Sequence, residues 1–211
     1  FLKRRGIAVA LIASGNYFSG AIWPPLFNSA LQSDGWRDVY GILAIATIFI
    51  MIPLSFLLTK KISEETSRAS DAASENRRSS VNISPRMLTI LLSIAGVGCC
   101  VAMSMPQVHI VAFCIDLGYG PAVGAEMLSL MLIGGVISRL INGLLADKLG
   151  GVYTLLIGST LQCIALFLYL PFDGLVSLYI VSAVFGLSQG GIVPSYAIII
   201  REYLPGAEAG T

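Results

Sequence analysis

Charged residues are scarce in this sequence of 211 residues. Asp, Glu, Lys and Arg make up 12% of it, whereas 55% is hydrophobic, and an ordinary soluble domain carries about twice that share of charge. Ten of the 25 charged residues lie within residues 59–86, so the other 183 residues carry only 15. That is too little polarity to cover a water-soluble globule. A soluble enzyme is therefore excluded, and a membrane protein with several spans is indicated.

Histidine is nearly absent, and the sequence also lacks an excess of basic residues and paired cysteines. One His and a net charge of +1 exclude the basic face that nucleic acids require. The spans hold no paired carboxylates, His cluster or nucleophile–base pair, so we expect no enzyme activity. The cysteines form no C-x-x-C pair, and we expect buried free thiols with no metal site and no cofactor. They are Cys99, Cys100, Cys114 and Cys163.

Six apolar stretches are long enough to cross a bilayer. They lie near residues 6–28, 39–58, 87–113, 123–145, 152–170 and 175–200. About 17–25 apolar residues span the hydrocarbon layer, and such segments must be helices because lipid offers no partner to backbone amides. The predicted fold class is all-α, a polytopic membrane bundle with six transmembrane helices.

Residues 59–86 differ from the rest of the chain. They are rich in Ser and charge and nearly free of aliphatic side chains, which is typical of a flexible linker. The chain is thus divided into residues 1–58, a linker at 59–86, and residues 87–211. Because it starts with Phe1 and stops in a polar stretch at Thr211, we expect a fragment of a longer protein.

The basic residues predict an orientation. With the N-terminus in the cytoplasm and six alternating spans, eleven Lys and Arg residues face inward and only Arg37 faces outward. This matches the positive-inside rule. Residues 1–5 and 59–86 are then cytoplasmic, in a multi-pass protein of the cell membrane (plasma or inner).

Arg139 is the clearest charged residue within a span, since Glu126 lies near the outer end of the same span. A charge there costs about 2.5–3.5 kcal/mol on insertion scales. Gly135 and Gly143 lie four residues before and after Arg139, so the three share one helical stripe. The glycines leave a notch for a small ligand or a partner helix, and a guanidinium suits a carboxylate. The alternative is that Arg139 reaches the cytoplasmic face or pairs with Asp147, about 12 Å further along the helix.

Residues 143–151 resemble the signature loop of the major facilitator superfamily, G-x-L-a-D-[RK]-x-G-[RK]. The matching positions are Gly143, Asp147, Lys148 and Gly150. Gly151 replaces the final base, which suits the second, degenerate copy of the loop between helices eight and nine. The resemblance implies that this loop, with its Asp and Lys, stabilises one gate.

Residues 1–8, followed by Ser14 and Gly15, resemble the helix-five motif of monocarboxylate porters, F-x-K-R-R-x-L-A, although Ala10 and Ser19 stand where that motif has Gly. Further likenesses to this branch and its oxalate/formate relatives lie at 36–41, 109–113, 116–118, 201–203 and 208–210. By this register the chain holds helices five to ten of twelve. Residues 1–58 are then the last two helices of the N-terminal bundle, and residues 87–211 are the first four helices of the C-terminal bundle.

In those relatives an arginine of helix eight binds the substrate carboxylate, and Arg139 falls on that position. Many proton-coupled members carry Asp four residues earlier, where this chain has Gly135; a coupling proton therefore stays open beside exchange and uniport. Further candidate substrate-binding residues are Asn16, Tyr17, Gln189 and Tyr196, for which interhelical hydrogen bonding is the alternative role.

These observations predict secondary active transport of small organic anions, mono- or dicarboxylates, by alternating access. The predicted partners are a small carboxylate and the lipid bilayer. Two other functions remain open: transport of another solute class, such as a sugar or a drug, and a non-transporting membrane sensor on the same fold.

Overall fold

The computed structural model describes residues 4–33, 35–57, 68, 71–72, 74–76 and 83–204. Its helices are α1 (Arg5–Ser33), α2 (Trp36–Leu57), α4 (Pro85–Asp116), α5 (Pro121–Leu149), α6 (Gly151–Leu168), α7 (Leu175–Gln189) and α8 (Ile192–Tyr203). No strand occurs in these ranges, which agrees with the all-α prediction. Most of the segments predicted to be cytoplasmic, 1–5 and 59–86, lie outside the described residues.

Six segments are long and apolar enough to cross a membrane, and they correspond to the six predicted spans. The last span differs from the prediction of one helix, because it divides into α7 and α8 at Gly190 and Gly191. Two glycines weaken a helix. Pro194 has no N–H to donate to the carbonyl of Gly190, which lies four residues earlier. The break therefore has a local cause that the hydropathy pattern does not reveal.

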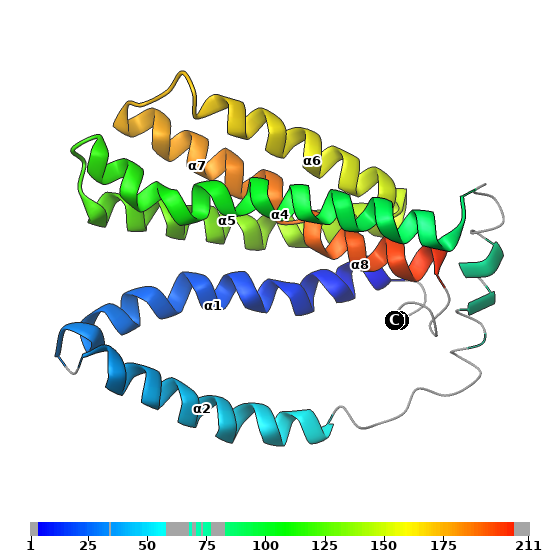
Figure 1. Ribbon diagram of the computed structural model, residues 1–211, viewed down its shortest axis with the longest axis horizontal. Coiled ribbons are helices and arrows are strands. Elements are labelled where there is room, and N and C mark those ends of the chain that lie inside the picture. The colour runs from blue at the N-terminus through cyan, green and yellow to red at the C-terminus, as the bar shows by residue number, and fades with distance from the viewer. Residues whose placement is uncertain are drawn as a thin grey trace.

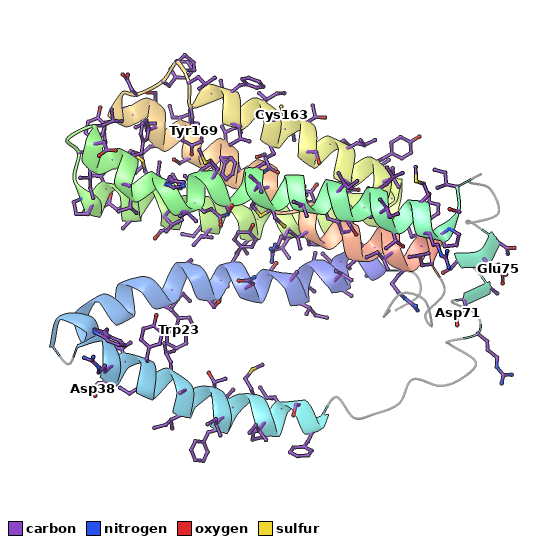
Figure 2. All side chains as sticks on the ribbon, in the orientation of Figure 1. Trp23, Asp38, Asp71, Glu75, Cys163 and Tyr169 are labelled. Carbon is purple, nitrogen blue, oxygen red and sulfur yellow. The ribbon has the colours of Figure 1, made fainter. Side chains whose placement is uncertain are left out.

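The helices are arranged around α5. In Figure 1, α1 runs along one side of α5, whereas α4, α6 and α7 gather on the other, and α1 and α5 pack along much of their length. In contrast, α2 packs mainly against α1. Many of its side chains project away from the bundle (Figure 2), and only 6% of the segment Trp36–Phe56 is buried. An apolar surface of this kind is suited to lipid or to further helices.

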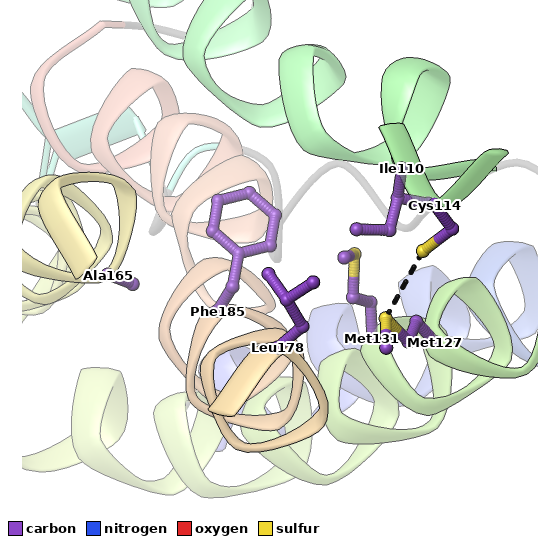
Figure 3. Close-up of a cluster of buried hydrophobic side chains, with 7 residues drawn as sticks. All are labelled: Ile110, Cys114, Met127, Met131, Ala165, Leu178 and Phe185. Atoms are coloured by element: carbon purple, nitrogen blue, oxygen red, sulfur yellow. Dashed lines mark hydrogen bonds between the residues drawn. The ribbon is translucent and has the colours of Figure 1, made fainter. Parts of the chain in front are cut away.

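The apolar core lies between α4, α5, α6 and α7. Figure 3 shows its buried members, which are Ile110, Cys114, Met127, Met131, Ala165, Leu178 and Phe185. The Cys114 thiol lies 3.7 Å from the Met127 sulfur, as a free thiol acting as an apolar group does. The expectation of buried cysteines is wrong for Cys100 and Cys163, which are exposed, because an apolar outer surface accommodates a thiol as readily as a core does.

Candidate functional site

Arg139 lies on α5, in the contact with α1, and only 4% of its surface is exposed. Its Nε donates to the backbone carbonyl of Gly190 at 3.1 Å, and its Nη1 donates to the carbonyl of Ala13 on α1. The guanidinium carbon lies 3.8 Å from the centre of the Tyr17 ring, close enough for a cation–π interaction. One cation therefore joins α5 to α1 and to the break between α7 and α8.

The carbonyl of Gly190 is free to accept this bond because of the helix break. In an uninterrupted helix it would accept from the amide of residue 194, but that residue is Pro194. The close approach also requires a glycine, since a Cβ at Gly190 would lie 2.8 Å from the Cβ of Ser138. The sequence Gly190-Gly191-x-x-Pro194 thus creates a backbone acceptor for Arg139.

The notch formed by Gly135, Arg139 and Gly143 is filled by a helix in this structure. A Cβ at Gly135 would lie 3.1 Å from the Tyr17 ring, and one at Gly143 would lie 2.5 Å from the Cβ of Ala10. Of the two occupants that the sequence left open, the partner helix α1 is the one observed. The alternative in which the Arg139 side chain reaches the cytoplasmic face is wrong, because that side chain is buried between helices.

The charge of Arg139 has no anionic partner among the residues that the structure describes. Both of its acceptors are neutral carbonyls, and the Asp147 carboxylate bonds elsewhere. A guanidinium has five N–H donors, and the described partners of Arg139, two carbonyls and the Tyr17 side chain, provide no carboxylate. A buried cation without a counter-charge is costly, and a site that retains one is suited to an anion.

A second polar contact lies beside Arg139. The Gln107 amide nitrogen on α4 donates to the Gln189 side-chain oxygen at 2.8 Å. Tyr17 donates through its hydroxyl to the sulfur of Met103 at 3.3 Å, and Met103 lies one helical turn before Gln107. The interior polar residues thus come from α1, α4, α5 and α7. Gln107 was not among the sequence candidates, although an amide in an apolar span is a signal that identifies it.

The structure brings only some of the predicted binding residues together. Arg139 and Tyr17 are in direct contact, and Gln189 directly precedes the Gly190 carbonyl that Arg139 binds. Asn16 is exposed and Tyr196 is half-buried, and neither has a described hydrogen bond to the Arg139 group. The binding role of all five residues stays a prediction.

Asp147 in the predicted gating loop joins α5 to α1. Its carboxylate accepts from the backbone amide of Gly6 at 2.6 Å and from that of Ile7 at 3.1 Å, at the first turn of α1. An anion is favourable there because it satisfies free amides and meets the positive end of the helix dipole. Lys148 is exposed, and Gly150 has a φ of +85° in the turn to α6.

A second carboxylate caps the helix that follows this loop. Glu202 on α8 accepts from the amide of Gly151, the first residue of α6, at 3.3 Å. A side chain at Gly151 is excluded, because a Cβ would lie 2.8 Å from Ile199. The glycine in place of a base at position 151 thus agrees with the close packing of α6 on α8.

The sequence profile of the Major Facilitator Superfamily matches residues 2–211. The chain belongs to this superfamily. With six helices able to cross a bilayer, it is an integral membrane protein, and the expectation that it is no enzyme agrees with its membership of a transporter family.

The curated relatives of this superfamily member are distant. Monocarboxylate transporter 13 of Rattus norvegicus is 25% identical over 205 residues, which cover 96% of this chain and 46% of the relative. The Agnestins efflux protein AgnL12 of Paecilomyces divaricatus is 26% identical over 197 residues, covering 92% of this chain and 43% of the relative. The chain thus spans about half the length of these relatives. No solved structure matches it.

Proposed function

We propose that the complete protein is a secondary transporter of small organic anions and that Arg139 binds the carboxylate of the solute. The observation that carries this proposal is a buried guanidinium whose described partners, two backbone carbonyls and the Tyr17 side chain, include no carboxylate. A carboxylate would bring the missing counter-charge and can accept two parallel N–H bonds from one guanidinium. The relatives named monocarboxylate transporters support the same solute class.

The geometry suggests how binding is linked to movement. The bond from Arg139 to Ala13 connects α5 to α1, and in the proposed register these helices belong to opposite halves of the transporter. A carboxylate that takes over this donor weakens the connection in the middle of the α1–α5 contact. The gating loop, with Gly143, Asp147, Lys148 and Gly150, holds the end of the same contact. Release of both contacts allows the two halves to rock around the solute.

Position 135 bears on whether a proton is coupled to transport. Gly135 offers no carboxylate one turn before Arg139, and its place against the Tyr17 ring leaves little room for one. We therefore propose no proton route through this position. Exchange of anions and uniport are the mechanisms that the described residues support.

The test is the uptake of labelled carboxylates by the complete protein in proteoliposomes. We expect Arg139→Gln and Arg139→Lys to lower uptake at least a hundredfold while both variants still insert, because a buried guanidinium contributes charge and two-point geometry. Arg37→Gln is the matched control, since Arg37 stacks on Trp36 at an exposed position and should leave uptake unchanged. Normal uptake by both Arg139 variants would contradict the proposal.

Transport of another solute class is the second candidate, because one relative is named an efflux protein. The same vesicles distinguish the two functions. Uptake of an uncharged solute that carboxylates do not inhibit would favour this second candidate, and the absence of all transport would favour a sensor.

A further inference from the structure

Gln189 is a buried amide with an unused donor. No part of its side chain is exposed, and its Nε2 has no hydrogen-bond partner among the residues that the structure describes. Its Oε1 already accepts from Gln107. Buried polar groups are nearly always paired, and an unpaired one calls for an explanation.

The position of Gln189 connects it to the proposed anion site. It is the last residue of α7, and the next carbonyl, that of Gly190, accepts from Arg139 at 3.1 Å. On the other side, Gln107 and Met103 lie one turn apart on α4, and Met103 accepts from the Tyr17 hydroxyl. The Tyr17 ring covers the guanidinium, and its hydroxyl also interacts with the Gln107 side chain. Gln189 is thus connected to Arg139 through one peptide unit, and Gln107 is connected to it through Tyr17.

The chemistry of the pair limits its ligand. An amide N–H donates a hydrogen bond but carries no charge, so it matches a neutral oxygen better than a second carboxylate. Arg139 is the interior cation of the described core and can balance one negative charge. We propose that Gln107 and Gln189 form a donor subsite for an uncharged oxygen, such as an oxo or hydroxyl group, on an anion whose carboxylate is held by Arg139. This inference rests on the proposed function.

A packing role for the unpaired amide can be tested within the same chain. Gln162 on α6 is also buried, with 3% of its surface exposed, and its Nε2 is likewise unpartnered among the described residues. It has no described bond to Gln107, Gln189 or Arg139. Gln162 is therefore a matched control that shares the burial and the unpaired donor but not the connection to the anion site.

The experiment compares butanoate with its oxo- and hydroxy-substituted analogues as inhibitors of uptake by the complete protein in proteoliposomes. We expect the wild type to favour the substituted anions. Gln107→Leu and Gln189→Leu should reduce that preference by roughly three- to tenfold, the value of one neutral hydrogen bond, and leave butanoate nearly unaffected. Gln162→Leu should keep the wild-type preference. Because Gln107 is only half-buried, its variant remains informative if Gln189→Leu does not fold.

Equal weakening of all three anions in the Gln107 variant would overturn the subsite and indicate a structural role. An unchanged preference would overturn it as well. Both results leave the proposed function intact, because butanoate still competes. If neither butanoate nor its analogues inhibit uptake by the wild type, the proposed function and the subsite fail together.

Discussion

The contact between α1 and α5 is built differently at its two parts. At the end that holds Asp147, small residues bring the backbones together, and a Cβ at Gly143 would lie 2.5 Å from Ala10. In the middle, large side chains meet, with the Arg139 guanidinium over the Tyr17 ring. The first part depends on the absence of side chains, whereas the second depends on one buried cation. In the proposed function, that cation would exchange its partner on α1 for the solute.

The electrostatics of the two parts also differ. Asp147 meets two backbone amides at the positive end of α1, so a charge is matched by a helix dipole. Arg139 meets neutral carbonyls, so no counter-charge matches it among the described residues. Under the proposed function, the middle contact is the one expected to respond to the solute.

The largest effect is expected from Gly143→Ala, which breaks the small-residue end. The new methyl meets Ala10 and the backbone of Ile7, so α1 and α5 must separate, at a cost of about 1–3 kcal/mol. Spin labels at the exposed positions Ile12 and Leu144 should report a longer interhelical distance in the complete protein. Gly15→Ala is the control, because a Cβ there meets nothing within 4 Å. An unchanged label distance in Gly143→Ala would show that the end is not set by packing.

A smaller effect is expected from Tyr17→Leu, which removes the ring from the guanidinium. A desolvated cation–π contact contributes about 2 kcal/mol. A double-mutant cycle with Arg139→Met, followed by unfolding in mixed micelles, should give a coupling energy of about 1–2 kcal/mol. Tyr17→Phe keeps the ring and loses only the bond to Met103, so it should retain most of the coupling. Additive free energies for Tyr17 and Arg139 would rule out the contact.

The smallest effect is expected from Asp147→Asn, which removes a charge but keeps an acceptor oxygen. The loss of a carboxylate at a helix N-terminus costs about 0.3–1 kcal/mol. The fraction of molecules with separated α1 and α5 should therefore rise roughly two- to fivefold, measured with the same spin labels. Glu202→Gln is the matched comparison, since its described bond joins α8 to α6. Equal label shifts in the two variants would remove the special role of Asp147.

The spans could be predicted from sequence because their cause is local. Hydrocarbon requires about 20 apolar residues per helix, and each of the six predicted stretches has a counterpart. The unfavourable position of Arg139 was visible for the same reason. The break before α8 had a readable signal in Gly190, Gly191 and Pro194, but a hydropathy window averages over it.

The partners of the polar residues could not be predicted, because they are distant in sequence. Gly6 and Asp147 are 141 positions apart, and no periodicity relates them. The same holds for Gln107 and Gln189, which are 82 positions apart. A helix stripe shows which residues face inward, but only the packing of helices shows which groups meet.

The turn between α5 and α6 consists of one residue, Gly150, which ends one helix and precedes the next. A connection of one residue cannot absorb a change in the angle between α5 and α6. In the proposed rocking motion, a displacement of Asp147 from α1 would also move the start of α6, which lies only four residues further on. The bond between Gly151 and Glu202 would pass that displacement to α8, so a small shift at one helix end would move three helices together.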